Sequence, residues 1–183
     1  MKTLCVSGHR PEGLAWFDGG YDKAMHGQFT ETIENYIKYA IEQGFSHFIA
    51  GGALGVDTDF ALCVLKLKKS GASITLEIAV PCKGQEKYWN LEDKAVYNYI
   101  LQNADKVSYL SEKYYPFCMQ YRNEYMVKNS DALLACWNGT RKGGTYNTIK
   151  FAQNLKKELL FIDLSENAPN GINCMIYFKN KIL

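Results

Sequence analysis

The chain has 183 residues, of which 47% are hydrophobic and 22% are charged, and its net charge is +2. This length and composition suit one folded domain with a sizeable core and exclude a globally disordered chain. The small net charge gives no basis for a polyanion partner. No apolar run approaches the roughly 18 residues that would predict a membrane span.

The cysteines and the N-terminus bear on the cellular compartment. The six cysteines are scattered along the chain without a CxxC pair. Cys5 and Cys136 lie inside apolar strand-like runs, which is typical of buried reduced thiols rather than of a disulfide framework. Residues 1–4 lead directly into a predicted strand, without the apolar region of a signal peptide. We therefore expect a cytoplasmic protein.

Strand and helix patterns alternate along the chain. Short apolar runs bounded by turn residues predict strands, and apolar positions three and four residues apart predict helices between them. Val96, Tyr99 and Ile100 are expected on the core side of their helix. In chain order the predicted elements are a strand at 3–7, a helix at 28–43, a strand at 46–50, a helix at 57–69, a strand at 74–80, a helix at 91–103, a strand at 106–110, a helix at 117–129, a strand at 132–137, a helix at 145–156 and a strand at 159–164.

This alternation predicts the fold class. Strands followed by helices imply parallel pairing with right-handed crossovers, and strands that are apolar on both faces indicate helices on each side of the sheet. We expect an α/β fold with a Rossmann-like, three-layer open sheet, mostly parallel, of about six or more strands. No Pro/Gly/Ser-rich linker divides residues 1–183, so they form one domain. Its peripheral C-terminal extension, 166–183, fits a strand or a short helix and carries the docking residues Ile172, Met175, Ile176 and Phe178.

Two glycine-bearing turns, each between a predicted strand and a predicted helix, are the strongest functional signal. Glycine lets backbone N–H groups approach a ligand, and the helix behind each turn offers free N–H groups and a positive dipole end. Neither turn has the Walker A or the G-x-G-x-x-G pattern. Together they predict a phosphate pocket. The residues concerned are Gly51, Gly52, Gly55 and Asp57 in the first turn and Trp137, Asn138, Gly143, Gly144 and Thr145 in the second.

Other candidates follow the remaining strand ends, where open α/β sheets bind ligands. Gly8, His9 and Arg10 follow the first strand, and the His9 and Arg10 side chains can donate to anionic oxygens. Gln85 follows the third strand and is a candidate contact for a base or a ribose. Trp89, in the same loop, is expected to pack in the core instead.

Several of these side chains have two interpretations. Asp57 either caps the following helix or contacts a sugar hydroxyl, and Thr145 either caps its helix or holds a phosphate oxygen. Arg122 either reaches a phosphate or pairs with a surface glutamate. Tyr121 and Tyr125 are expected on the core face of that helix. The three dispersed histidines and the lack of a G-x-S-x-G motif predict neither a metal site nor a recognisable catalytic set.

The motifs together resemble the YpsA-like proteins of the SLOG superfamily, which also contains DprA and the Lonely Guy phosphoribohydrolases. They are residues 7–11, the turn at 51–57, Arg122-Asn123, and Trp137-Asn138-Gly139 followed by Gly143-Gly144-Thr145. The resemblance covers nearly all of residues 1–165 and implies a bacterial protein with a pocket for a nucleotide or nucleotide-derived ligand. Lonely Guy enzymes carry a catalytic glutamate in PGGxGTxxE. That position holds Thr148 here, which argues against hydrolase activity of the Lonely Guy type in this chain.

We therefore expect a protein that binds a nucleotide-like small molecule, as a sensor, without a cofactor or a metal. The glycine turns would hold phosphate, Arg10 and Arg122 would neutralise it, and Asn138 or Gln85 would contact ribose or base. One alternative is an enzyme that cleaves an N-glycosidic or phosphate bond with a carboxylate from Asp57 or Glu124. The other is a single-stranded DNA or protein-interaction module, although the near-neutral charge argues against nucleic acid. A homo-oligomer is compatible with each of them.

Overall fold

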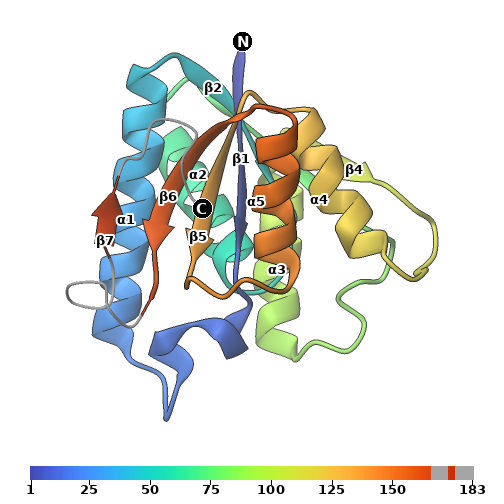
Figure 1. Ribbon diagram of the computed structural model, residues 1–183. Helices are drawn as coiled ribbons and strands as arrows, with labels where there is room; N and C mark the ends of the chain where they lie inside the picture. Colours follow the sequence, from blue (N-terminus) through green and yellow to red (C-terminus); the bar gives the residue numbers. More distant parts are fainter. Residues whose placement is uncertain (166–172, 176–183) are drawn as a thin grey trace.

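The alternating pattern folds as six parallel strands and a seventh, antiparallel strand at one edge, in the order β4-β3-β2-β1-β5-β6-β7 (Figure 1). The computed structural model describes residues 1–165 and 173–175. The strands are β1 (Lys2–Gly8), β2 (Phe45–Ala50), β3 (Thr75–Val80), β4 (Lys106–Tyr109), β5 (Ala132–Trp137), β6 (Glu158–Asp163) and β7 (Asn173–Met175). The helices are α1 (Lys23–Glu42), α2 (Val56–Lys69), α3 (Leu91–Asn103), α4 (Cys118–Lys128) and α5 (Gly144–Asn154), with the 3-10 turns η1 (Pro11–Gly13) and η2 (Ala15–Phe17).

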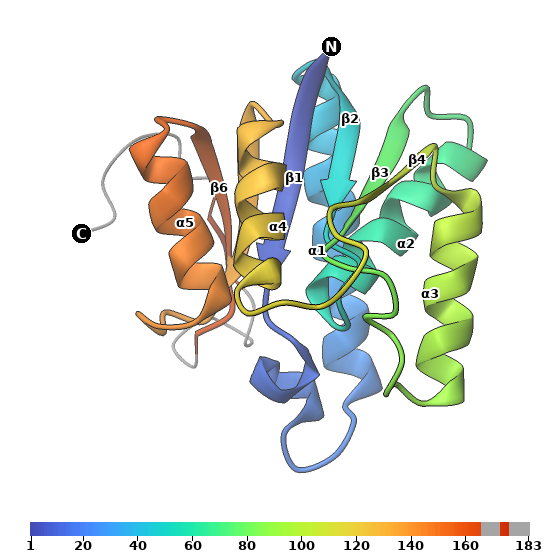
Figure 2. The ribbon, with the colours of Figure 1, turned by 90° about the vertical axis from the view of Figure 1, so that its right-hand side faces the viewer.

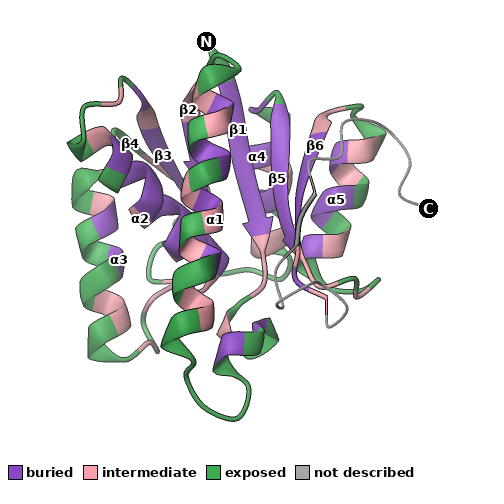
Figure 3. Ribbon diagram, turned by 90° about the vertical axis from the view of Figure 1, so that its left-hand side faces the viewer, coloured by how far each residue is buried: buried purple, intermediate pink, exposed green. Residues whose placement is uncertain are grey.

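Helices lie on both faces of the sheet, so the predicted three-layer, Rossmann-like α/β fold is confirmed. Helix α2 contacts both α1 and α3 on one face, and α4 contacts α5 on the other. Figure 2 shows α4 and α5 in front of the strands, and Figure 3 shows α1 crossing the opposite face. The central strands are mostly buried, as a sheet covered on two sides requires, whereas the edge strand β4 has no buried residue.

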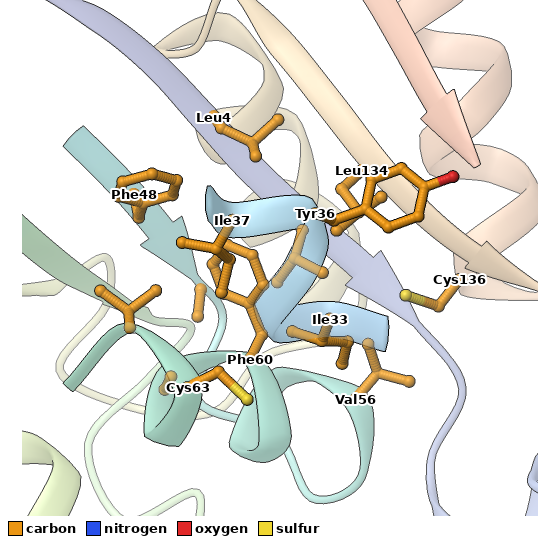
Figure 4. Close-up of a cluster of buried hydrophobic side chains, with 14 of the residues drawn as sticks. Leu4, Ile33, Tyr36, Ile37, Phe48, Val56, Phe60, Cys63, Leu134 and Cys136 are labelled. Atoms are coloured by element: carbon orange, nitrogen blue, oxygen red, sulfur yellow. The ribbon is translucent and has the colours of Figure 1, made fainter. Parts of the chain in front are cut away.

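The larger hydrophobic core lies beneath α1 and α2. Ile33 and Ile37 of α1 meet Phe60 of α2, whose ring lies 6.1 Å from that of Phe48 in β2 (Figure 4). Tyr36 is also buried, and its hydroxyl donates to the carbonyl oxygen of Phe161 at 2.7 Å. This packing fixes the start of α2, and with it the first glycine turn, against the end of β1.

The strand order creates one topological switch point. From β1 the chain builds outward through β2, β3 and β4, then returns to place β5 on the other side of β1. Gly8 at the end of β1 is paired in register with Cys136 of β5. In sheets of this type the ligand crevice lies outside the carboxyl ends of the strands at that point. The segment with η1 and η2 lies just beyond this edge (Figure 1).

The start of helix α1 differs from the sequence prediction. Helix α1 begins earlier than the predicted residue 28, because Asp22 caps it by accepting from the N–H groups of Ala24 and Met25 at 2.9 and 3.0 Å. Gly27, a poor helix former, therefore lies inside the helix.

The predicted core side of α3 was wrong for two residues. Val96 and Tyr99 are 37% and 50% exposed, whereas Tyr97 and Ile100 are buried. Helix α3 packs chiefly on α2 near the sheet edge, and the Tyr97 hydroxyl accepts a hydrogen bond from Nε2 of Gln85 at 3.0 Å. That bond and the packing turn Tyr97 inward.

The C-terminal extension contributes β7, which pairs antiparallel with β6 through Ile162 and Cys174. Ile172, Ile176 and Phe178 lie outside the described residues. The five cysteines in the described ranges whose side chains can be placed, Cys174 excepted, are buried and free, as predicted. Within residues 1–165 and 173–175, no helix is long and apolar enough to cross a membrane.

Candidate functional site

A small pocket of about 60 Å³ opens at the topological switch point. We call it the switch-point pocket. It combines residues from the end of β1, the first glycine turn, α4 and the start of α5. Seven of the predicted site residues line it. The lining residues are Ser7, Gly8, Arg10, Ala53, Leu54, Asp57, Arg122, Asn123, Gly144 and Thr145.

Close packing explains the glycines around this pocket. A Cβ at Gly8 would lie 2.5 Å from side-chain atoms of Val56, and one at Gly51 would collide with the guanidinium of Arg122. Gly52 and Gly55 have φ of +66° and +84°, a region that other residues rarely adopt. The glycines therefore let the end of β1, the turn and α4 meet without intervening side chains.

A buried ion pair holds the first glycine turn. Nη1 of Arg122 lies 3.3 Å from Oδ2 of Asp57 and also donates to the carbonyl oxygen of Gly51. The same Asp57 oxygen accepts from the N–H of Ala53 at 3.2 Å. Burial raises the pKa of Asp57, and the Arg122 guanidinium opposes that shift. An arginine stays charged in proteins, so the pair carries no net charge into the pocket.

This pairing corrects two sequence interpretations. Asp57 is not an N-cap, because α2 is capped by Gly55 and the Asp57 carboxylate reaches back to the turn. Arg122 pairs with that buried aspartate rather than with a surface glutamate. Its Nε donates to Oδ1 of Asn123 at 2.8 Å, whereas Nη2 has no hydrogen-bond partner in the part of the chain that the structure describes.

The core face of α4 is rotated from its predicted position. Arg122 is only 6% exposed, whereas Tyr121 is 52% exposed. Tyr125 is half-buried, and its hydroxyl donates to the buried carboxylate of Glu77 in β3 at 2.8 Å. The buried residues Cys118, Arg122 and Met126 are spaced by four, so the sheet-facing stripe of α4 contains a charge. Its charged partner on α2 allows this burial.

The two helices that begin at the switch-point pocket have no side-chain caps. Gly55 precedes α2 and Gly143 precedes α5, and neither supplies an acceptor for the first N–H groups. Thr145, predicted as a possible cap, lies inside the first turn of α5. By contrast, Asp22 and Asn90 cap α1 and α3 through their side chains. The site therefore presents helix N–H groups that no side chain satisfies.

His9 lies beside the pocket rather than in it. Its Nε2 accepts a hydrogen bond from the N–H of Asn138 at 3.2 Å, which ties the loop after β1 to the loop after β5. Burial lowers the pKa of His9. A neutral ring with its proton on Nδ1 fits both observations. Donation from His9 to an anionic oxygen stays a prediction.

The remaining predicted residues surround the pocket without lining it. The Gln85 amide nitrogen donates within the chain, at 3.0 Å to the Gly52 carbonyl and to the Tyr97 hydroxyl. Nε1 of Trp137 donates to the Thr140 carbonyl at 2.9 Å. Oδ1 of Asn138 accepts from the N–H of Thr140 at 3.1 Å. Direct ligand contacts by Gln85 and Trp137 stay predictions.

Thr148 occupies the position at which Lonely Guy enzymes carry their glutamate. It is fully buried, and its hydroxyl donates to the carbonyl of Gly144 at 2.8 Å. This side chain therefore lies on the buried face of α5 and offers no carboxylate to a ligand. Glu124, the other carboxylate considered for catalysis, pairs with Lys128 and Gln120 along α4. Across residues 1–165 and 173–175, no cluster of three or more His, Cys, Asp or Glu side chains is arranged to hold a metal ion.

Two histidines near this edge are expected to shift stability with pH in opposite directions. The lowered pKa of His9 gives stability that is present above about pH 6.5 and is lost as the pH falls. The hydrogen bond that His26 donates to Asp59 raises the pKa of His26, which gives stability below about pH 6.5 that is lost as the pH rises through the raised value. Urea unfolding measures this across the pH range. The free energy of unfolding should fall less at acidic pH in His9→Gln, and less at alkaline pH in His26→Gln, than in the wild-type protein. An unchanged pH profile in both variants would contradict these assignments.

The fold and the site define a class: a Rossmann-like α/β protein with a small polar pocket at the switch point between β1 and β5. Within this class the chain belongs to the YpsA family. The family model, described as the YspA SLOG family, matches residues 4–166. Both the fold and the family implied by the motif resemblance are thereby confirmed.

Relatives in the bacilli are similar along most of the chain. The "Uncharacterized SPbeta prophage-derived protein YoqJ" of Bacillus subtilis is 37% identical over 118 residues, covering 58% of this chain and 68% of that protein. A UPF0398 protein of Halalkalibacterium halodurans is 28% identical over 160 residues, covering 86% of this chain and 84% of that protein. A UPF0398 protein of Bacillus cereus is 27% identical over 161 residues, with 84% and 83% covered. These names assign no activity.

Proposed function

We propose that the protein binds a phosphate-bearing nucleotide or nucleotide-derived ligand at the switch-point pocket. The observation that carries the proposal is the pair of glycine-capped helices, α2 and α5, that begin at one pocket without a side-chain acceptor. A bound phosphate would accept from their N–H groups and complement both helix dipoles.

The charge and size of the pocket support a phosphate. Arg10 and Arg122 carry two positive charges and Asp57 one negative charge, so these three side chains sum to +1. Arg10 is exposed and close enough to Asp57 and Arg122 to interact electrostatically with both. A volume of about 60 Å³ equals roughly two water molecules, which suits one small anionic group.

We also propose a sensing role in the cytoplasm. Thr148 stands where Lonely Guy enzymes carry their catalytic glutamate, so the carboxylate that their hydrolysis requires is missing, and binding without conversion is the simpler role. Buried free thiols fit a reducing compartment. A sensor predicts that a nucleotide recovered after incubation with the protein is chemically unchanged.

Ligand binding is tested by thermal shift with adenine and guanine nucleotides, ADP-ribose, NAD and inorganic pyrophosphate. We expect at least one phosphate compound to raise the Tm in proportion to the logarithm of its concentration. Arg10→Gln should raise the Kd of the best ligand roughly tenfold, because it removes a charge-assisted contact. Arg141→Gln is the matched control, since Arg141 is exposed and does not line the pocket. Failure of every compound at millimolar concentration would refute the proposal.

A further inference from the structure

A second, larger cavity lies beside the switch-point pocket. Its volume is about 540 Å³, within the roughly 300–1,000 Å³ of small-molecule sites. One wall is the segment 12–18, which follows β1, and the other is formed by the ends of β5 and β6. We call it the flap cavity. Nothing in the phosphate chemistry of the neighbouring pocket accounts for it.

The two spaces meet at His9. Its chain neighbours Gly8 and Arg10 line the switch-point pocket. Its own side chain packs on Gly13 and accepts from the N–H of Asn138, and both of those residues line the flap cavity. A Cβ at Gly13 would lie 3.1 Å from the Cβ of His9. The imidazole therefore lies between the residues that line the two spaces.

The chemistry of the flap cavity is opposite to that of the pocket. Among the described residues its lining includes no Lys, Arg or His, and it includes the carboxylates of Glu12 and Asp18. The Asn138 oxygen is used by Thr140, which leaves the Asn138 amide N–H groups as donors. Thr140 and Ser165 add hydroxyl groups. Such a surface repels phosphate and suits an uncharged group with several hydroxyls.

Residues 12–18, which we call the flap, are anchored to the hydrophobic core. Trp16 is 1% exposed and packs on Phe29 with ring centroids 4.4 Å apart. The Trp16 carbonyl accepts from the N–H of Asp22, the residue that caps α1, at 2.8 Å. Because Trp16 anchors residues 12–18 to the core, the cavity has a fixed wall.

We propose that one ligand occupies both spaces, with a phosphate in the switch-point pocket and the ribose of a nucleoside in the flap cavity. The ligand class is thus a phosphorylated nucleoside, not a free polyphosphate. Glu12 and Asp18 accept hydrogen bonds from the ribose hydroxyls. The bond between phosphate and ribose lies beside His9. This assignment rests on the proposed phosphate site and adds the direction in which the ligand extends.

The test measures binding by calorimetry with inorganic pyrophosphate and with the nucleotide that gives the largest thermal shift, in its ribose and 2′,3′-dideoxyribose forms. The wild-type protein should bind the ribonucleotide at least about tenfold more tightly than either other probe. The double variant Glu12→Gln/Asp18→Asn should lose that preference and bind pyrophosphate unchanged. Glu86→Gln/Glu112→Gln, which changes two carboxylates outside both spaces, should keep it.

A second variant blocks the flap cavity without changing its charge. Ala15→Phe places a ring in the flap cavity from an exposed position of η2. It should abolish the ribonucleotide preference and leave pyrophosphate binding intact, with far-UV circular dichroism unchanged. The assignment would be overturned, while the phosphate site stands, if the wild-type protein bound pyrophosphate as tightly as the ribonucleotide. It would also be overturned if both variants kept the ribonucleotide preference. No binding of any probe would instead remove the proposed function and this inference together.

Discussion

Arg122→Met is expected to lower the free energy of unfolding by about 3–5 kcal/mol, because it leaves the Asp57 carboxylate buried without its partner. Asp57 is 6% exposed and would keep partial compensation from backbone N–H groups, including that of Ala53 at 3.2 Å, and from the charge of Arg10. Without the guanidinium, burial would raise the pKa of Asp57 further. The folded variant would then favour the protonated acid, so its deficit relative to wild type should shrink as the pH falls.

Urea unfolding at several pH values measures this effect, and two controls define it. Asp57→Leu/Arg122→Met removes both charges and should be less destabilised than Arg122→Met alone, giving a clear coupling energy in a double-mutant cycle. Lys128→Met changes a half-exposed lysine on the same helix, 3.7 Å from Glu124, and should cost no more than about 1 kcal/mol. An Arg122→Met variant as stable as Lys128→Met would show that the ion pair does not hold the turn.

The fold was predictable because its signals are local. Each strand and helix is marked by its own periodicity and by the turn residues at its ends, and alternation alone then implies parallel pairing. The bounds of α3 and β5 coincide with the predicted ranges. The largest difference between predicted and observed helix bounds is the start of α1, because Asp22 caps the helix earlier than the apolar periodicity indicates.

The partners inside the site were not predictable, because they are distant in sequence. Arg122 and Asp57 are 65 positions apart, and His9 and Asn138 are 129 positions apart. Tyr121 and Tyr125 gave α4 an apparent apolar stripe. Helix periodicity alone cannot show that the charge of Arg122 is paired with a buried aspartate on another helix. Amphipathic patterns therefore misplace a helix face whenever a charge is buried by pairing.

The helix caps at the switch-point pocket also differ from the sequence prediction. Capping rules favour Asp and Thr side chains, and the sequence offers Asp57 and Thr145 near the two helix starts. The structure places Gly55 and Gly143 at these positions instead, so no capping side chain accepts from the first N–H groups of either helix. A local rule that fails at two neighbouring helix ends, both at the switch point, is the pattern expected of a binding site.

Gly55→Ala is expected to lower the free energy of unfolding by about 3 kcal/mol or more, and also to weaken phosphate binding. The backbone at Gly55 has φ of +84° and ψ of −130°, a region essentially reserved for glycine, which costs another residue about 1–3 kcal/mol. The added Cβ would lie 2.6 Å from the carbonyl oxygen of His9. Backbone strain and collision therefore act together.

Gly139→Ala separates the two effects. Gly139 has the same φ of +84°, but its Cβ would meet nothing within 4 Å, so only backbone strain of about 1–2 kcal/mol is expected. The collision at Gly55 has a further consequence, because the His9 carbonyl also accepts from the N–H of Val56 at 3.2 Å. Pushing that carbonyl away would move Arg10 and the end of β1 from the start of α2. Urea unfolding and pyrophosphate titration should therefore show both losses for Gly55→Ala, and equal behaviour of the two variants would mean that this contact does not assemble the site.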